Sequence, residues 1–406
     1  MKDERETRET REKALRVVWE RLGTRLPAVD RATREARLFG ITSISCRHNE
    51  EGAEGVLLAA AAGKLDRLRD LDVSSCYRVD AGALAPLTRL TRLVVNHNDV
   101  GRPWALASLT GLRSLDISYC YLNWTMISDA LEGLSGLTYL DINHNFLGYH
   151  MAGVDMTPLA ALTGLRDLNV RSCINPYSLD VVPRVAFFAA AIARLTGLTR
   201  LDVGRNAIGI SAEELTSLTG LRGLNIGRCE LSSLSFLKDL TGLTHLDVSD
   251  HDMMAILEDD PDALAALAAL TGLRSLEITR CHLLVDAAET IACLTGLTSL
   301  DVSNNDDYYD SDSDDSDDDD VLRFGGVVGI RALTALTGLR ALRAHSCGLG
   351  PWGAETIASL TRLTFLDVSW NPDLNRDGAA DRAFTALTHL AWADFDKYTP
   401  EYNFGG

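Results

Sequence analysis

Cysteine, asparagine and histidine recur at one regular position along this sequence, and cysteine and histidine are the side chains that most often bind metals or carry redox chemistry. That position is occupied in turn by Cys76, Asn98, Cys120, Asn145, Cys173, Asn206, Cys229, His251, Cys281, Asn305, Cys347 and Asn371. Cysteine and asparagine alternate, and His251 is the exception. No two cysteines form the C-x-x-C pair that is typical of zinc and thiol redox sites. The spacing therefore predicts reduced structural thiols.

The remaining histidines and serines do not form a recognisable catalytic or metal-binding pattern. His48, His97 and His144 each precede the recurring position, but in alternate repeats. Strands in a sheet are about 5 Å apart, so these rings would lie about 10 Å apart, too far to share one metal ion. No Ser–His–Asp pattern and no glycine-rich phosphate loop after a strand is found. We expect a protein that is not an enzyme and has no cofactor or metal.

The charge distribution limits the classes of partner. The chain has 39 Lys and Arg against 57 Asp and Glu, a net charge of −18. This balance disfavours nucleic acid, whose phosphates need clustered basic residues. The first residues are densely charged and lack the apolar core of a signal peptide, and no apolar run of about 18 residues indicates a membrane span. We expect no membrane association and an intracellular location, cytoplasmic or nuclear, where thiols stay reduced.

The recurring residues belong to an internal repeat with the phrase L-T-G-L-x-x-L-D-V. Strong units begin at Leu65, Leu87, Leu109, Leu134, Leu162, Leu195, Leu218, Leu240, Leu270, Leu294, Leu336 and Leu360. A weaker unit begins at Leu38 and a truncated one at Leu387, so the array covers residues 38–393 with about 13–14 units. Alternating apolar and polar residues predict one short strand per unit, and segments such as 262–270 predict helices between the strands. A single unit cannot bury its own apolar face, so the units must stack.

The unit resembles the leucine-rich-repeat consensus L-x-x-L-x-x-L-x-[VI]-x-x-[NC]-x-[LI]. One unit matches it with Leu134, Leu137, Leu140, Ile142, Asn145 and Leu147. The alternation of Cys and Asn resembles the ribonuclease-inhibitor-like type, mixed with shorter L-T-x-L units. The resemblance implies an α/β leucine-rich-repeat horseshoe solenoid, with a parallel β-sheet on the concave face and helices and loops on the convex face. The Asn or Cys side chain is expected to turn inward and satisfy backbone groups of the adjoining loops.

Exposed strand positions would line the concave face; counting the first Leu of a unit as one, they are positions 6, 8, 10 and 11. Position 8 carries an acidic stripe that includes Asp116, Asp141, Asp202, Asp247, Asp301 and Asp367. The stripe is either a solvated consensus residue of a duplicated unit or an electrostatic complement to a basic partner. Arginines at positions 6, 10 and 11 are Arg171, Arg200, Arg205, Arg228 and Arg280. They could form cross-strand ion pairs or serve as anchors for a partner.

Aromatic residues gather at two places on the same predicted face. Phe365 and Trp392 share position 6 in adjacent units, and Trp370 occupies position 11. They are candidate binding residues, or they cover the open end of the solenoid. A second cluster contains Tyr119, Tyr121, Tyr139 and Phe146, from which Tyr119 and Tyr139 are candidate binding residues.

Three segments differ from the repeats. Residues 1–37 predict a helical N-terminal cap, although residues 15–31 also resemble part of an F-box, a motif that often precedes such repeats. Residues 306–320 hold ten Asp, cannot pack, and are expected to form a disordered acidic insertion. Ser311 and Ser316 each have Asp three residues later and are candidate phosphorylation sites. Residues 394–406 form a C-terminal tail.

These features together predict a non-enzymatic protein–protein interaction scaffold that binds a protein partner on its concave face and is monomeric on its own. Two alternatives remain open. The F-box resemblance implies a substrate adaptor of a ubiquitin ligase, and the repeat array could instead be a structural component of a larger assembly.

Overall fold

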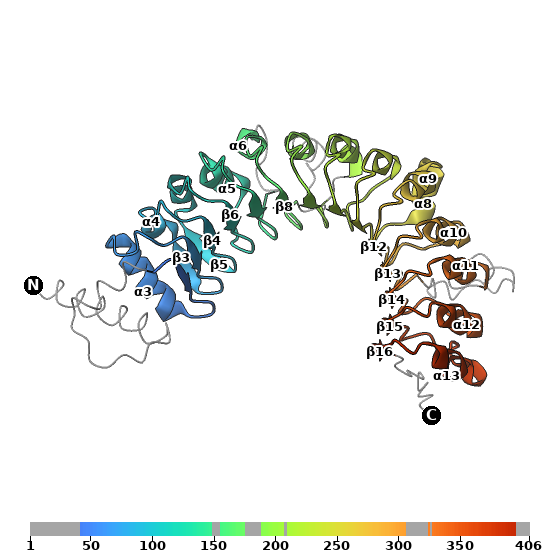
Figure 1. Ribbon diagram of the computed structural model, residues 1–406. Helices are drawn as coiled ribbons and strands as arrows, with labels where there is room; N and C mark the ends of the chain where they lie inside the picture. Colours follow the sequence, from blue (N-terminus) through green and yellow to red (C-terminus); the bar gives the residue numbers. More distant parts are fainter. Residues whose placement is uncertain are drawn as a thin grey trace, which may run out of the picture. The chain divides into compact units, whose positions relative to one another are not determined.

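The computed structural model describes residues 41–147, 155–174, 188–206, 209–305, 324 and 327–394. The chain divides into two compact units, unit 1 from Met1 to Asp202 and unit 2 from Val203 to Gly406. Within each unit the strands line one side and the helices cover the other (Figure 1). We call the exposed side of the strands the sheet face and the opposite side the helix side.

Unit 1 contains a parallel sheet in which each repeat adds one three-residue strand. Its strands are β1 (Ser43–Ser45), β2 (Asp70–Asp72), β4 (Arg92–Val94), β6 (Ser114–Asp116), β7 (Tyr139–Asp141), β8 (Asp167–Asn169) and β9 (Arg200–Asp202). Neighbouring strands pair residue for residue, so that Leu115 lies opposite Leu140 and Asp116 opposite Asp141. Strand β1 belongs to the weak first unit, which is therefore a genuine repeat. Equal repeat positions thus lie side by side along the sheet.

The helix side of unit 1 is built from short helices of two kinds. They are α3 (Glu50–Ala61), α4 (Ala81–Leu84), the 3-10 helix η1 (Pro103–Ser108), α5 (Trp124–Leu131) and α6 (Thr157–Ala160). Asn49 caps α3 and Asn123 caps α5, each accepting a backbone hydrogen bond at its side chain. A second, two-stranded sheet joins β3 (Tyr77–Asp80) to β5 (Asn98–Gly101).

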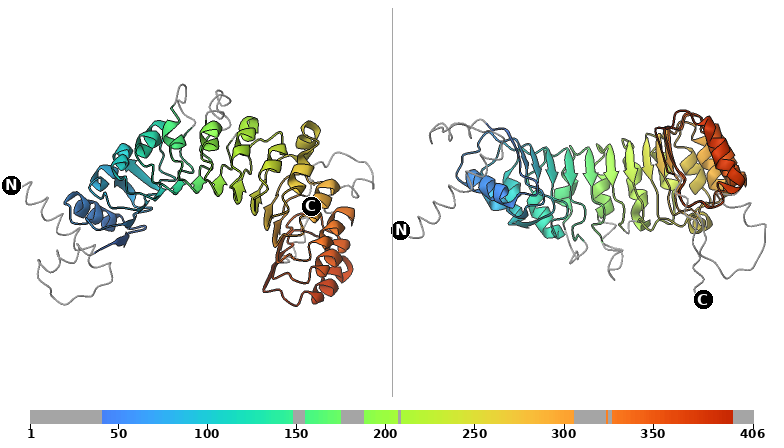
Figure 2. Two further views of the ribbon diagram at one scale, coloured as in Figure 1. Left: turned by 45° about the horizontal axis from the view of Figure 1, so that its top comes forward. Right: turned by 90° about the horizontal axis from the view of Figure 1, so that it is seen from below.

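Unit 2 repeats the same plan. Its strands are β10 (Gly223–Asn225), β11 (His245–Asp247), β12 (Ser275–Glu277), β13 (Ser299–Asp301), β14 (Ala341–Arg343), β15 (Phe365–Asp367) and β16 (Trp392–Asp394). Figure 2 shows the strands of each unit lying side by side and running in one direction. The truncated last unit of the sequence therefore contributes the strand β16, which includes Asp394.

Alpha and 3-10 helices are also mixed on the helix side of unit 2. The α-helices are α8 (Met253–Asp259), α9 (Ala263–Ala268), α10 (Val285–Cys293), α11 (Val327–Ala332), α12 (Pro351–Ser359) and α13 (Ala379–Ala383). The 3-10 helices are η2 (Gly209–Ser217), η3 (Ser235–Asp239), η5 (Leu333–Ala335), η6 (Arg376–Gly378) and η7 (Phe384–Ala386). The predicted helix over 262–270 is confirmed as α9. Short repeats leave too few residues for a full α-helical segment, and 3-10 turns span the same path in fewer residues.

The core of each unit is a set of stacked leucine rows. Leu134, Leu137 and Leu140, at positions 1, 4 and 7 of their repeat, are fully buried. Burying one such side chain contributes about 2 kcal/mol. Larger groups fill the space under the helices: Trp124 is buried and its indole N–H donates to the Asp155 carbonyl at 3.1 Å. The predicted stacking of repeats is confirmed within each unit.

Several predicted segments lie outside the described residues. These are the N-terminal cap or F-box-like segment 1–37, the acidic insertion 306–320 with Ser311 and Ser316, and residues 395–406 of the tail. No helix among the described residues has the length and apolar content needed to cross a membrane.

Candidate functional site

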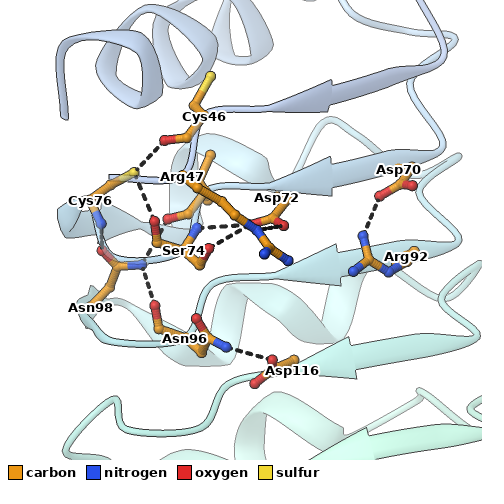
Figure 3. A network of polar contacts seen from close by, with 11 residues as sticks. Cys46, Arg47, Asp70, Asp72, Ser74, Cys76, Arg92, Asn96, Asn98 and Asp116 are labelled. Carbon is orange, nitrogen blue, oxygen red and sulfur yellow. Dashed lines mark hydrogen bonds and ion pairs between the residues drawn. The ribbon is translucent and has the colours of Figure 1, made fainter. Parts of the chain in front are cut away.

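The recurring Asn side chains turn inward and satisfy backbone groups of adjoining loops, as the sequence predicted. The side-chain oxygen Oδ1 of Asn145 accepts from the backbone N–H groups of Cys120 and Leu122, at 3.2 and 3.0 Å. Its amide donates to the carbonyls of Ile117 and Ile142, both at 2.9 Å. Figure 3 shows the equivalent Asn98 between Cys76 and the neighbouring turn. We call this row of Asn, Cys and His251 the ladder.

The ladder cysteines act as buried thiol donors. Cys120 Sγ donates to the Val95 carbonyl at 3.3 Å, and Cys281 Sγ donates to the Val248 carbonyl at 3.4 Å. Burial raises the pKa of both thiols to about 12. Each thiol therefore stays protonated and unreactive at neutral pH, because the thiolate is the nucleophile and metal ligand. The prediction of structural thiols is confirmed by these hydrogen bonds.

His251 replaces asparagine in the ladder by using its two ring nitrogens. Nδ1 lies 2.9 Å from the Val248 carbonyl and must donate, while Nε2 lies 3.2 Å from the Cys229 N–H and accepts. Only a neutral imidazole protonated at Nδ1 makes both bonds. Burial lowers the pKa of His251 below its usual value of 6.5. The imidazole is thus a structural group that must remain uncharged.

A second alternation, of Arg and Thr at position 5, was missed in the sequence. Repeats with a ladder Cys carry Arg, and the next repeats carry Thr; the row contains Arg69, Thr91, Arg113, Thr138, Arg166, Thr199, Arg222, Thr244, Arg274, Thr298, Arg340 and Thr364. Arg113 Nη1 donates to the Gly136 carbonyl at 2.7 Å, and Thr138 Oγ1 donates back to the Arg113 carbonyl at 3.0 Å. A side chain at Gly136 would collide with this guanidinium. The structural module is therefore a pair of repeats.

Position 11 forms a row of residues in the left-handed backbone region. It contains His48, Ser75, His97, Tyr119, His144, Ser172, Arg205, Arg228, Asp250, Arg280, Asn304, Ser346 and Trp370, with φ between 50° and 60°. That conformation costs a non-glycine residue about 1 kcal/mol. The backbone is held by hydrogen bonds between repeats, for example from Tyr119 N–H to the Asn143 carbonyl at 3.0 Å. These side chains are exposed or half-buried at one edge of the sheet face, so a variable row is displayed on a fixed backbone.

The acidic stripe is less solvated than the sequence indicated. Asp141 is buried, and the other candidate carboxylates Asp116, Asp202, Asp247, Asp301 and Asp367 are half-buried. Asp116 accepts from the Ser118 N–H at 3.0 Å and from its hydroxyl at 2.7 Å, and Asp367 binds Ser369 in the same way. The carboxylates of Asp116 and Asp367 thereby each close a turn.

The expectation that position 10 is an exposed position is also wrong for several repeats. Ser118, Ser249, Ser303 and Ser369 are buried at this position. The turn that joins position 8 to position 10 draws the serine back against the sheet, so its side chain does not point outward.

Two adjacent carboxylates of the stripe lie together in unit 1. Asp116 and Asp141 are directly opposite each other on β6 and β7. Asp141 accepts from the Asn143 N–H at 3.0 Å and from the Asn169 amide at 3.0 Å. Burial, with a contribution from Asp116, raises the pKa of Asp141 from 3.8 to about 6. The candidate residue Tyr139 lies beside this pair, with its hydroxyl 3.4 Å from Asp141 Oδ2.

Three of the five candidate arginines form ion pairs across adjacent repeats. Arg171 lies 3.9 Å from Asp202, Arg200 lies 3.5 Å from Asp167, and Arg280 lies 3.3 Å from Asp250. These side chains are exposed or half-buried, so each pair contributes little to stability. Within the described ranges no ion pair reaches Arg205 or Arg228, and both side chains are exposed.

The aromatic residues near the end of unit 2 form a surface that we call the C-terminal aromatic patch, comprising Phe365, Trp370 and Trp392. Phe365 and Trp392 are in register on β15 and β16, and their rings stack with centres 4.3 Å apart. Trp392 and Trp370 are 46% and 49% exposed. The Arg343 guanidinium lies 4.5 Å from the centre of the Phe365 ring. The Phe365 and Trp392 rings therefore cover one another on the sheet face, and the Trp370 ring lies beside His345 with ring centres 6.0 Å apart.

The second predicted cluster is divided into two contacts, and two histidines join it. Tyr119 is sandwiched between His97 and His144, with both ring-centre distances 4.2 Å. We call these three the unit 1 aromatic row. Tyr121 lies beside Phe146, with ring centres 6.0 Å apart. The sequence signal that places His97 and His144 next to Tyr119 is their shared position 11.

The fold matches solved structures of repeat proteins. An internalin from Listeria monocytogenes is 21% identical, with 95% of this chain and 94% of that chain covered and a TM-score of 0.52. A leucine-rich-repeat protein from Leptospira interrogans is 15% identical, with 92% and 100% covered and a TM-score of 0.52. This chain has the leucine-rich-repeat fold. The ribonuclease-inhibitor-like subtype stays a prediction.

No protein-family model matches the chain, and no curated protein matches it either. In the part of the chain that the structure describes, no three His, Cys, Asp or Glu side chains gather to hold a metal ion.

Proposed function

We propose that this chain is a non-enzymatic scaffold that binds a protein partner on the sheet face. The observation that carries the proposal is the C-terminal aromatic patch. Phe365 and the half-exposed Trp392 stack at position 6 of strands β15 and β16, and the half-exposed Trp370 follows β15 at position 11. Tryptophan, tyrosine and arginine are the residues that most often dominate binding energy at protein interfaces. A rigid aromatic surface of this kind loses little side-chain entropy when a partner binds.

Two exposed arginines at the edge of the sheet face support the same role. Arg205 and Arg228 occupy position 11 of adjacent repeats, where the left-handed backbone displays them at the edge of the sheet face. Exposed guanidiniums can bind carboxylates of a partner in two-pronged geometry. The proposed face therefore offers aromatic and charged contacts.

The proposed scaffold acts in a reducing compartment, the cytoplasm or nucleus. The ladder thiols of Cys120 and Cys281 are buried donors to backbone carbonyls. Oxidation would remove the donor and add an oxygen to a packed core, which would destabilise the array. A reducing environment preserves this part of the fold.

The test compares partner capture by three forms of the full-length chain: wild type, the double variant Phe365→Ala/Trp392→Ala, and the control Trp352→Ala. Trp352 lies on helix α12 and is 46% exposed, the same fraction as Trp392. Tagged proteins are used for affinity purification and mass spectrometry, with circular dichroism to check the fold. We expect the double variant to lose at least about tenfold of the captured partner, as hot-spot truncation does, and the control to retain it. Equal capture by the double variant and the wild type would contradict the proposal.

A further inference from the structure

The unit 1 aromatic row is an exposed surface away from the C-terminal aromatic patch. Tyr119 is 38% exposed within its sandwich of two imidazoles. Tyr121 is 73% exposed beside Phe146, which is exposed as well. Clustered exposed rings of this kind mark interaction sites, because a monomer surface seldom leaves them open to water.

The carboxylates of Asp116 and Asp141 are held next to this row by the backbone. Asp116 binds Ser118, the residue before Tyr119, and Asp141 binds Asn143, the residue before His144. Because the strands pair in register, the two carboxylates are one strand spacing apart, about 4.8 Å. The row of rings is therefore flanked by two adjacent negative groups.

Neighbouring carboxylates of unit 1 pair with arginine, whereas Asp116 and Asp141 accept hydrogen bonds from neutral donors such as the Asn96 amide, at 2.7 Å, and the Asn169 amide, at 3.0 Å. Asp72 pairs with Arg47 at 2.6 Å, and Asp70 pairs with Arg92 at 2.8 Å, as Figure 3 shows. On the other side, Asp167 and Asp202 also have arginine partners. Among the described residues no ion pair reaches Asp116 or Asp141. The Arg47 guanidinium interacts with Asp116 only through space, while it is bonded to Asp72.

The electrostatic interaction between Asp116 and Asp141 is unfavourable and would be relieved by a bound cation. Two ionised carboxylates on adjacent strands repel each other, and burial adds a desolvation cost. The raised pKa of Asp141, about 6, is the consequence. A cation bound beside both groups would remove this cost.

The C-terminal aromatic patch shows how the same framework accommodates a cation. There Arg343 occupies position 8, where most repeats have Asp, and its guanidinium lies on the Phe365 ring. The chain thus supplies its own cation to the stacked rings of unit 2. In the repeats of Tyr119 and His144 position 8 is Asp116 or Asp141, so the position that supplies a cation in unit 2 supplies a carboxylate here.

We propose that the unit 1 aromatic row, with Asp116 and Asp141, binds a basic segment of a partner protein through an arginine side chain. The guanidinium lies against the rings and pairs with the two carboxylates, which combines cation–π and charge-assisted hydrogen bonds. This inference rests on the proposed protein-binding function, but it concerns a different surface. The acidic charge selects a basic segment and disfavours an acidic one.

The test uses a fluorescently labelled hexa-arginine peptide and the full-length chain, measured by fluorescence anisotropy at about 150 mM salt, where long-range attraction is screened. The variant is Asp116→Asn/Asp141→Asn, and the matched control is Asp247→Asn/Asp301→Asn in unit 2. Both pairs remove two charges from the same type of turn. Asn is compatible with this turn, since Asn169 and Asn225 already occupy position 8 and accept from backbone N–H groups at 3.1 and 3.0 Å.

We expect the unit 1 variant to bind the peptide about tenfold more weakly and the control to stay within about twofold of wild type. Tyr119→Ala should also weaken binding, by about fivefold, whereas Tyr119→Phe keeps the ring face and the affinity. Equal weakening by both Asp→Asn pairs would overturn the proposal, since binding would then follow net charge. Self-association that is abolished only in the unit 1 variant would overturn it as well, because the occupant would be a second copy of the chain.

The two proposals can fail separately. Phe365→Ala/Trp392→Ala leaves the unit 1 aromatic row unchanged, so peptide affinity should remain that of wild type. Loss of peptide binding in that variant would overturn the assignment of the basic segment to unit 1. Retained partner capture in the same variant would overturn only the role of the C-terminal aromatic patch.

Discussion

The unit 1 aromatic row and the C-terminal aromatic patch both stack rings from adjacent repeats, but they differ in repeat position and in charge: the row uses position 11, whereas Phe365 and Trp392 use position 6. In both, rings from adjacent repeats stack, with centres 4.2 Å apart at Tyr119 and 4.3 Å apart at Phe365. Position 8 of the Tyr119 repeat is Asp116, whereas the Phe365 ring contacts Arg343, which is position 8 of the repeat before it. The repeat backbone thus fixes where a ring is displayed, and one neighbouring residue decides whether the surface attracts or already contains a cation.

The ladder gives a second comparison between the two units. In unit 1 the ladder amide is Asn98 or Asn145, and neither side chain titrates. In unit 2 one of the ladder positions that would carry asparagine holds His251, which makes the same kind of backbone contacts only while it is neutral. The ladder asparagines and His251 therefore make similar contacts, but only the contacts of His251 depend on pH.

The largest expected effect is the loss of a ladder side chain. Asn145→Ala removes four hydrogen bonds to the backbone and leaves three groups without a partner, because the Ile142 carbonyl keeps the Cys173 thiol. His251→Ala removes two and leaves one group, because the Val248 carbonyl keeps the Cys281 thiol. An unsatisfied buried group costs about 1–3 kcal/mol, so we expect losses of about 4 and about 2 kcal/mol of local stability. Hydrogen exchange with mass spectrometry resolves the two units separately. The reverse order of losses would show that the bond count does not determine ladder stability.

Acidification should separate the two units. His251 has a folded-state pKa below 6.5, so its contribution to stability is complete above pH 6.5 and is lost as pH falls through that lower pKa. Asp141 acts in the opposite sense: its pKa is raised from 3.8 to about 6, so the folded state takes up a proton first and gains stability as pH falls from about 6 towards 4. From pH 7.5 to 5.5, the protection factors, which are corrected for the intrinsic pH dependence of exchange, should fall around His251 and should not fall around Asp141.

The variant His251→Asn is the control for this pH response. Asparagine occupies the ladder position in the repeats that alternate with the cysteine repeats, and it carries no proton-dependent charge. The acid-dependent loss of protection in unit 2 should therefore disappear. Persistence of that loss in the variant would assign it to groups other than His251.

A smaller effect is expected from neutralising the carboxylate pair. Asp141→Asn removes a buried carboxylate. Burial raises the pKa of this carboxyl from 3.8 to about 6, which corresponds to roughly 3 kcal/mol against its charged form. Part of this gain is offset, because the asparagine cannot accept as many hydrogen bonds from Asn169 and Tyr139. We expect a net gain of about 1 kcal/mol in urea unfolding at pH 7.5, shrinking towards pH 4.5. Asp301→Asn, in a half-buried turn of unit 2, should give no such gain.

The smallest expected effect comes from giving the C-terminal aromatic patch the acidic character of the unit 1 aromatic row. In the Asp116→Asn/Asp141→Asn background, Arg343→Asp removes the cation on Phe365 and restores the consensus carboxylate. The affinity for hexa-arginine should rise by about threefold, the scale of an exposed cation–π contact. The control Arg362→Asp makes the same charge change at an exposed residue before β15. An equal rise in the control would mean that net charge, and not position 8, sets the peptide affinity.

Much of the fold was predictable because the repeat period constrains it at every unit. The register that pairs Leu115 with Leu140 follows from equal unit length between the first Leu and the strand. The inward direction of Asn145 follows from its place directly after the turn. The alternation of Arg113 and Thr138 was visible in the same letters, but its meaning depends on Gly136 of the next repeat.

The candidate binding residues were predicted by position but not by contact. Phe365 and Trp392 share position 6, and the sequence sufficed to place them together. It did not show that Asp116 and Asp141 turn back to close their own turns, because an Asp side chain can either face solvent or bind its backbone. The sandwich of Tyr119 between His97 and His144 depends on side-chain directions set by the left-handed backbone.

The sequence by itself determined the repeat, the strand register, the leucine rows and the ladder, since all of these follow from a period that the chain repeats many times. Only the tertiary structure decided which carboxylates have a cation. Among the residues that the structure describes, Asp70, Asp72, Asp167 and Asp202 form ion pairs with arginines, and Asp116 and Asp141 do not. The physical reason is that an ion pair depends on the reach and direction of two side chains from neighbouring repeats, which residue types and spacing leave open.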